Sequence, residues 1–156
     1  MNYIKLQQDF IKKYLNRSFS KCYIFDDYEN VKVSTDGIAL YIVPCDLWVL
    51  DSKRFIKQWG ECNFINDFCK VDNYHNAYLT PIKRKLATGK GTAVLVEDNS
   101  GNRCWINESY LKYFDVTAKF KILDSIHPVA VFENEKLVGI ICVIRVTEDE
   151  DNNTES

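Results

Sequence analysis

The stretch from Thr92 to Val146 constrains the fold more than any other part of this 156-residue chain. It begins with two β-prone runs that flank Asp98-Asn99-Ser100-Gly101, where the glycine permits the strained backbone of a tight hairpin turn. Three further β-prone runs follow, and the last is apolar almost throughout, which is typical of a central strand covered on most sides. We therefore predict strands over 92–97, 103–106, 118–123, 128–132 and 137–146.

A short helix is expected between the second and third of these strands. Asn107 is a residue type that caps helix N-termini well, because its side chain accepts a hydrogen bond from a free backbone N–H group. The apolar residues Tyr110, Leu111 and Phe114 follow at helical spacing. The sequence therefore predicts a hairpin, an Asn-capped helix and three more strands, in that order.

The N-terminal part is predicted to be one amphipathic helix followed by a meander of strands. Residues 2–16 place apolar side chains at helical spacing, with Leu6 and Phe10 in the middle of the stripe. Four β-branched or aromatic runs follow, separated by turn sequences that include Thr35-Asp36-Gly37. These runs cover residues 22–25, 31–34, 38–43 and 47–50.

The middle of the chain gives weaker signals. Residues 51–59 have the spacing of a short helix, whereas 61–79 have no clean period and suggest an irregular excursion. The basic stretch 81–91 is interpreted as a solvated connector or helix end, with contact to a phosphate backbone as the alternative. Its Gly-Lys-Gly-Thr sequence lacks the earlier glycine of a P-loop, so nucleotide hydrolysis is not expected. The length allows two small repeats that share a core, but no sequence repeat indicates a duplication.

The order of elements over residues 92–146 resembles the closing part of one domain of the bacterial DNA sliding clamp. In that family a strand leads into an Asn-capped helix of the form N-x-x-Y-L, which Asn107, Tyr110 and Leu111 match here. Further matching positions are Pro128 and Val129 in the next strand, the terminal triplet Ile144-Arg145-Val146, and Thr35-Asp36-Gly37 with Leu40, which is similar to the family's T-D-G-x-x-L hairpin.

The resemblance implies an α+β fold over residues 1–146, in the form of a sliding-clamp-like single domain with antiparallel β-sheets and two or three short helices. It also implies a non-enzymatic, DNA-binding replication-accessory protein whose partner is the backbone of duplex DNA. Basic side chains on the helices and on the 81–91 stretch would face the phosphates. The nucleic-acid-binding candidates are Lys5, Lys12, Lys13, Lys83, Arg84, Lys85 and Lys112.

Two departures from the family pattern bear on function. The clamp ring contains six such domains and this chain supplies one, so encircling a duplex would require self-association. The partner groove of the clamp uses a Pro-Met pair near the C-terminus, and the matching positions here are Val143 and Ile144. Together with Arg145, these residues form the candidate partner groove that the resemblance implies.

The charge distribution supports a second hypothesis. The segment 147–156, expected to be a disordered tail, has five acidic and no basic residues, and without it the chain has 20 basic and 17 acidic residues, a net charge of +3. This charge is mild for a DNA-binding protein that cannot encircle its target. The alternative is a phage or mobile-element interaction module that binds a host replication or defence protein. Its candidate anchors are the aromatic residues Trp48, Trp59, Tyr74 and Tyr78.

Catalysis, metal binding and cofactors are not expected. His75 and His127 are the only side chains with an ordinary pKa near neutrality, and His127 is best explained by a role in a turn. The spacing of Cys62, Cys69 and His75 matches no common zinc site. No run reaches the roughly 18 apolar residues of a membrane span, and the first residues lack the apolar core of a signal peptide. We therefore expect a cytoplasmic protein with no membrane contact.

Overall fold

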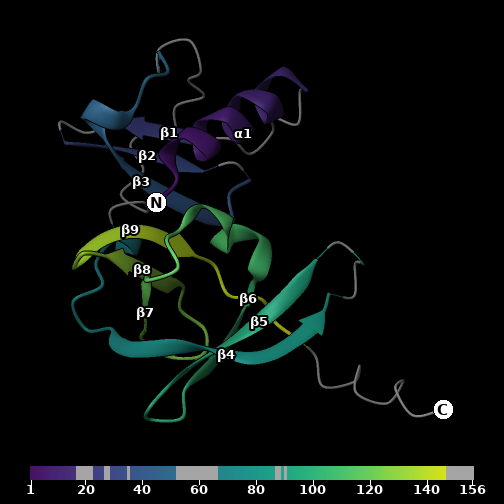
Figure 1. The fold of residues 1–156 in the computed structure, drawn as a ribbon. Helices are drawn as coiled ribbons and strands as arrows, with labels where there is room; N and C mark the ends of the chain where they lie inside the picture. Colours follow the sequence, from purple (N-terminus) through teal and green to yellow (C-terminus); the bar gives the residue numbers. More distant parts are fainter. Residues whose placement is uncertain are drawn as a thin grey trace.

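The computed structural model describes residues 1–16, 23–26, 29–34, 36–51, 67–86, 89 and 91–146. The helices and strands are α1 (Tyr3–Leu15), β1 (Tyr23–Asp26), β2 (Asn30–Ser34), β3 (Ala39–Pro44), η1 (Cys45–Leu47), β4 (His75–Lys85), β5 (Thr92–Asp98), β6 (Arg103–Asn107), η3 (Glu108–Tyr113), β7 (Lys119–Ile122), β8 (Val129–Glu133) and β9 (Lys136–Ile141). The strands form one antiparallel sheet in the order β1-β2-β3-β9-β8-β7-β4-β5-β6, so the fold is α+β, as predicted (Figure 1).

The sheet contains two units that meet where β3 pairs with β9. Each unit is a helix followed by a three-stranded antiparallel meander, α1 with β1–β3 and η3 with β7–β9. At the junction Tyr41 lies opposite Gly139 and Leu40 opposite Ile140. The two meanders are therefore arranged symmetrically about this junction, each with its third strand, β3 or β9, at the centre. The architecture is repeated although the sequence is not, because a meander requires only apolar alternation and turns.

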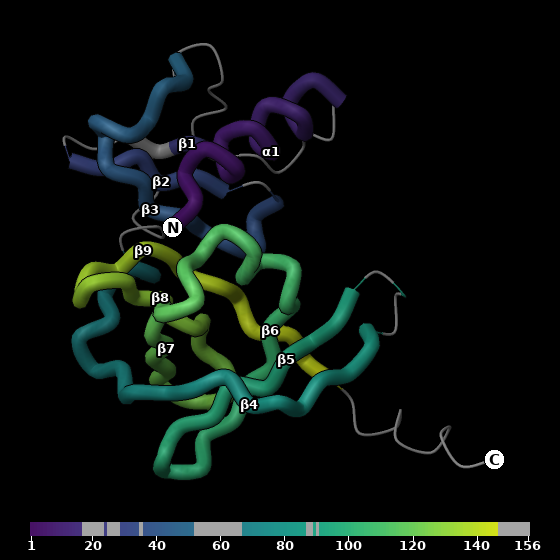
Figure 2. Tube along the Cα trace, in the orientation of Figure 1, coloured from purple at the N-terminus to yellow at the C-terminus, as the bar shows by residue number. Residues whose placement is uncertain are grey.

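Strands β4, β5 and β6 extend the sheet beyond β7 of the second unit, and β6 contacts the chain after β9 of the same unit. The first residues of β4 pair with both β7 and β5. Directly after β9, the Ile144 N–H donates to the Trp105 carbonyl of β6 at 2.7 Å and forms a single bridge there. Strands β4 to β9 therefore make a closed ring of pairings, which can be followed along the tube in Figure 2.

Both helices pack against one buried cluster that spans the two units. The predicted stripe of α1 is confirmed, because Leu6 and Phe10 are fully buried in this cluster, and Asn2 caps the helix by accepting from the Lys5 N–H at 3.0 Å. The cap at Asn107 is also confirmed, since its side chain accepts from the Ser109 N–H at 2.9 Å. The helix that it begins is a 3-10 helix.

Three sequence-based assignments are wrong. Residues 47–50 are not a strand, because Gln7 of α1 occupies the Leu47 carbonyl and the Val49 N–H that a neighbouring strand would use. Residues 75–85, assigned to an irregular excursion and a connector, form β4, whose alternation is interrupted by a register shift between Leu79 and Lys83. Strand β9 ends at Ile141, five residues earlier than predicted, because the chain leaves for β6. Residues 52–59 and 147–156 lie outside the described part of the chain.

The two motifs that carry the clamp resemblance, the hairpin at Asp36 and the helix at Tyr110, contact each other. The Tyr110 hydroxyl donates to Asp36 Oδ2 at 2.6 Å, while Asp36 Oδ1 accepts from the Ile38 N–H at 3.0 Å. The Tyr41 hydroxyl donates to the Tyr110 carbonyl at 3.1 Å. Helix η3 is thereby attached to the β2–β3 turn of the other unit.

Phe114, the residue after η3, packs directly on the backbone of Gly139. A Cβ atom at Gly139 would lie 2.4 Å from Phe114 Cζ, so only glycine fits beneath the ring. On the other side, the ring centroid of Phe114 lies 5.5 Å from that of Tyr41, which in turn packs edge-on against Tyr113 at 5.0 Å. Gly139 therefore permits the close approach that fixes the end of η3.

We expect Gly139→Ala to destabilise the protein. Overpacking a core destabilises the folded state by about 1–3 kcal/mol. Replacing glycine by alanine also reduces the conformational freedom of the unfolded chain, but this stabilises the protein by only roughly 0.4–1 kcal/mol. Urea denaturation should show a lower midpoint with an unchanged slope, and the second substitution Phe114→Leu should recover part of the loss. An unchanged midpoint for Gly139→Ala would contradict the close approach.

Candidate functional site

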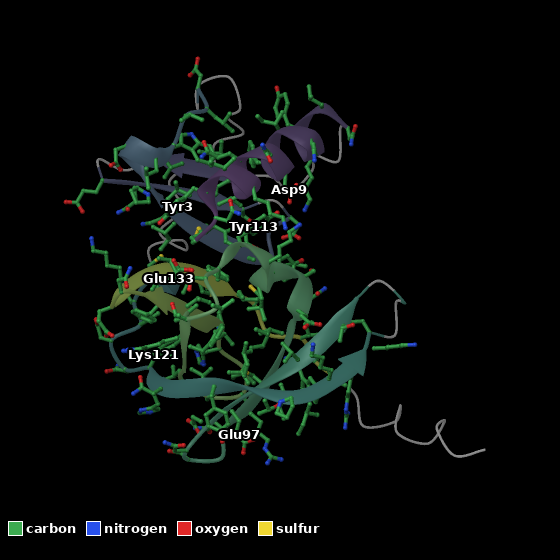
Figure 3. All side chains as sticks on the ribbon, viewed as in Figure 1. Tyr3, Asp9, Glu97, Tyr113, Lys121 and Glu133 are labelled. Carbon is green, nitrogen blue, oxygen red and sulfur yellow. The ribbon has the colours of Figure 1, made fainter. Side chains whose placement is uncertain are left out.

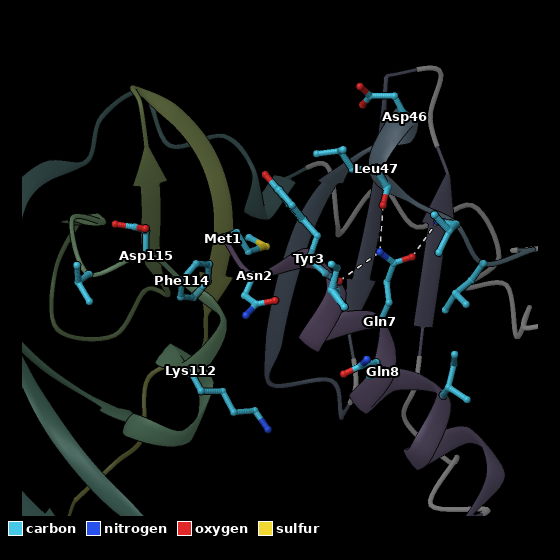
Figure 4. A pocket seen from close by; sticks show the side chains of 15 residues that line it. Met1, Asn2, Tyr3, Gln7, Gln8, Asp46, Leu47, Lys112, Phe114 and Asp115 are labelled. Carbon is cyan, nitrogen blue, oxygen red and sulfur yellow. Dashed lines mark hydrogen bonds between the residues drawn. The ribbon is translucent and has the colours of Figure 1, made fainter.

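A groove of about 900 Å³ lies beside the start of α1. The segment from η1 to Leu50 forms one side of it and the residues after η3 form the other (Figure 4). We call it the α1 groove and define it by its apolar residues Ile4, Leu47, Val49 and Val116 and its carboxylates Asp46 and Asp115.

Exposed apolar side chains concentrate in this groove. Val116 is fully exposed, Val49 is 81% exposed and Ile4 is 72% exposed. Four of the ten exposed large hydrophobic residues in the described part of the chain line this one groove. Exposed apolar residues on a monomer are usually scattered singly, so this concentration makes the groove the candidate contact site.

Gln7 fixes the wall that presents Leu47 and Val49. Its side chain is buried, and the amide nitrogen donates to the Leu47 carbonyl at 3.0 Å and to the Tyr3 carbonyl at 3.2 Å. The amide oxygen accepts from the Val49 N–H at 2.8 Å, so all three bonds can be followed in Figure 4. The end of η1 and the residues after it are thus held to the helix through their backbone, with Leu47 and Val49 exposed and Trp48 packed against the core.

The opposite wall is fixed by Phe114 and two carboxylates. The Asp115 N–H donates to Glu133 Oε1 at 2.7 Å, and Glu133 also pairs with the Met1 amino group. Asp115 Oδ1 accepts from the N–H of Thr117 at 2.9 Å and from its hydroxyl at 2.7 Å. These bonds hold the backbone on both sides of the exposed Val116.

Asp9 and Tyr113 join α1 to η3 behind the groove (Figure 3). The Tyr113 hydroxyl donates to Asp9 Oδ2 at 2.8 Å, and the Lys112 ammonium lies 3.1 Å from the same oxygen. Burial raises the pKa of Asp9, but these two hydrogen bonds and the charges of Lys112 and Lys12 outweigh it and hold the pKa below its ordinary value. Asp9 is therefore ionised at neutral pH and compensates the charge of Lys112.

Two cations and two carboxylates line the groove, and a negative excess arises because both cations are paired with further carboxylates. The cations that line it, Lys112 and the Met1 amino group, are paired with Asp9 and Glu133. Hydrogen bonds from Thr117 lower the pKa of Asp115, so this carboxyl is ionised at neutral pH. Within the described ranges neither Asp115 nor Asp46 forms an ion pair, although the Met1 amino group also contributes to the lowered pKa of Asp115.

The predicted nucleic-acid-binding residues are only partly brought together. Lys5 and Lys12 are exposed on α1, where Lys13 is half-buried, and Lys112 of η3 is next to Asp9. On β4, Lys83 pairs with Glu108, Arg84 lies 5.1 Å from the ring centroid of Trp105, and Lys85 is exposed. Two of the seven candidates, Lys83 and Lys112, thus already bind carboxylates of this chain.

The partner groove implied by the clamp resemblance lies elsewhere in the fold. Val143 is half-buried against the core, the backbone of Ile144 forms the bridge to Trp105, and Arg145 is exposed. None of these three residues lines the α1 groove.

None of the described aromatic residues considered as partner anchors lines this groove, although Trp48 lies between its lining residues Leu47 and Val49. Trp48 packs against Phe10 with ring centroids 6.1 Å apart, Tyr74 is half-buried and Tyr78 is exposed on β4, while Trp59 lies outside the described residues. A signal for the groove was present in the sequence. Ile4 lies beside the buried stripe of α1 and is exposed, so an apolar residue at this position is a local indication of the groove.

Outside the groove, one turn brings a histidine and an aspartate together. His127 Nδ1 lies 2.7 Å from Asp124 Oδ2, and Asp124 Oδ1 accepts from the backbone N–H groups of Ile126 and His127. His127 therefore has the turn role that the sequence predicted.

Within the described ranges, no three His, Cys, Asp or Glu side chains are arranged to hold a metal ion. The longest helix there has 13 residues, and none has the length and apolarity of a membrane span.

Comparisons with known proteins add no relative. No protein-family model, curated protein or solved structure matches this chain. No relative therefore indicates a function for this chain.

We expect Gln7→Leu to destabilise the wall of the groove. The substitution leaves the Leu47 carbonyl and the Val49 N–H without their partner, and a buried unsatisfied group costs about 1–3 kcal/mol. Hydrogen exchange should show faster exchange of the Val49 amide, and urea denaturation should show lower stability. The matched control is Gln8→Leu, which changes the exposed neighbouring residue in the same way. Equal Val49 exchange in both variants would contradict this role of Gln7.

Proposed function

We propose that this protein is a non-enzymatic protein-interaction module that holds an apolar segment of a partner protein in the α1 groove. The observation that carries the proposal is the concentration of Ile4, Leu47, Val49 and Val116 around one groove of about 900 Å³. Ligand sites in proteins are typically concave, mostly apolar and of about this volume. The walls are held by Gln7 and Glu133, so the groove is formed before any partner arrives.

The strength of the interaction can be bounded from the apolar contacts. Fully burying one aliphatic side chain of this size contributes about 1.5–3 kcal/mol. Association costs at least about 4 kcal/mol in lost translational and rotational freedom. The groove alone therefore supports binding of micromolar strength or weaker, which suits a transient contact.

The test of this proposal is a selection of binders with the purified full chain. We expect a phage-displayed library of random dodecamer peptides to yield peptides with two or more large apolar residues. The double variant Val49→Asp with Val116→Asp should weaken their binding at least tenfold in calorimetry, because it places charge among the apolar contacts. The control is Ile126→Asp, an exposed position outside the groove. Peptides that bind both variants equally would contradict the proposal.

A second candidate is a clamp-like, DNA-binding replication-accessory module. Two observations favour it: the order β6, Asn-capped η3, β7, β8 and β9 agrees with the order expected from the resemblance, and Lys5 and Lys12 are exposed on α1. The ion pairs of Lys83 and Lys112 count against it, because phosphates would have to compete with Glu108 and Asp9. It therefore ranks second. A host replication or defence protein as partner is an extension of the first proposal that depends on the same resemblance.

Light scattering with and without duplex DNA separates the two candidates. A clamp-like role predicts a ring-sized closed assembly, or a DNA complex whose affinity falls steeply between about 50 and 200 mM salt. Lys5→Glu with Lys12→Glu should abolish that complex, whereas Lys136→Glu, at an exposed lysine on β9, should not. A monomer or dimer that ignores DNA would exclude the clamp-like role.

A further inference from the structure

The carboxylates Asp46 and Asp115 give the α1 groove a charge pattern that its apolar residues do not require. Figure 4 shows Asp46 on the side of η1 and Asp115 on the side of Phe114. Neither forms an ion pair within the described ranges, and the one lysine that lines the groove, Lys112, is paired with Asp9. The cations that do line the groove already have carboxylate partners of their own, Asp9 and Glu133.

This pattern excludes several occupants by charge. The segment 147–156 of this chain has five acidic and no basic residues, so it has the wrong sign for the groove. A phosphate backbone or an anionic membrane surface has the wrong sign as well. An apolar segment without charge would fill the centre of the groove but would make no ion pair with either exposed carboxylate.

From this charge complementarity we infer that the α1 groove selects a peptide segment in which large apolar residues are flanked by Lys or Arg. The inference rests on the proposed interaction function and specifies its partner. The apolar residues contact Ile4, Val49 and Val116, and the flanking cations lie against Asp46 and Asp115. Complementary charge of this kind acts mainly on specificity and on the association rate, while the apolar contacts supply the affinity.

The two carboxylates differ in how firmly they are held. Asp115 Oδ1 is fixed by the N–H and hydroxyl of Thr117, which leaves Oδ2 for a partner. Asp46 is exposed on a 3-10 turn and has no hydrogen bond within the described ranges. We therefore expect Asp115 to discriminate more sharply between flanking residues than Asp46 does, because a fixed acceptor loses less freedom on binding.

The experiment uses the full chain and the peptides enriched from the random dodecamer library. Each enriched peptide is synthesised twice, once as selected and once with its Lys and Arg residues replaced by Gln. We expect Asp115→Asn and Asp46→Asn each to weaken the cationic form by about twofold to fivefold. The Gln form should bind all three proteins equally, and added salt should reduce its affinity less than that of the cationic form.

A charge reversal gives the sharper readout. Asp46→Lys should lower the affinity for cationic peptides and raise it for the same apolar peptides flanked by Glu. Asp46 has no hydrogen-bond partner to lose within the described ranges, so circular dichroism and urea denaturation should be unchanged.

The outcomes separate this inference from the function on which it rests. Peptides that lose binding with Val49→Asp and Val116→Asp but ignore every change at Asp46 and Asp115 would leave the interaction function standing and overturn the charge selection. Enrichment of acidic flanks would overturn it as well. A selection that yields no peptide dependent on the groove would overturn both proposals. A second copy of this chain as occupant, seen as a groove-dependent dimer in light scattering, would also overturn the inference.

Discussion

The contact between Phe114 and Gly139 determines how the two units of this protein fit together. Gly139 lies on β9 opposite Tyr41 of β3, at the only pair of strands that joins the units in the described part of the sheet. Because no Cβ intervenes, the Phe114 ring reaches the backbone and contacts Tyr41. The end of η3 is thereby placed beside α1, where Tyr113 meets Asp9. The wall of the α1 groove that follows η3 depends on this arrangement.

The groove also shows how buried polar contacts can keep apolar side chains exposed. Gln7 would be an unfavourable residue inside an apolar stripe without partners, but its amide satisfies backbone groups of Leu47 and Val49. Since those backbone groups are engaged by a helix, the segment does not join the sheet, and Leu47 and Val49 remain exposed while Trp48 packs against the core. The polarity of one buried residue thus decides where the apolar surface lies.

The sequence was sufficient for elements whose signals are local. The Asn107 cap, the Gly101 hairpin and the α1 stripe all depend on neighbouring residues, and all are confirmed. The errors arose where contacts between residues distant in sequence determine the structure. Residues 47–50 do not form a strand because Gln7 binds their backbone, and β4 was missed because the register shift after Leu79 breaks its alternation. Apart from the local indication at Ile4, the groove could not be predicted for the same reason, because Ile4, Val49 and Val116 become neighbours only after the units have docked.

The pairing of Tyr41 with Gly139 has a consequence for the folding kinetics. Each meander joins strands that are close in sequence, whereas the β3–β9 pair closes a loop of most of the chain. Closing so long a loop is entropically costly and slow, so local meanders are favoured early and the junction late. Contacts that form after the transition state govern the unfolding rate more than the folding rate. We therefore expect substitutions at the junction of the two units to shorten the lifetime of the native state, and with it of the groove, more than they slow folding.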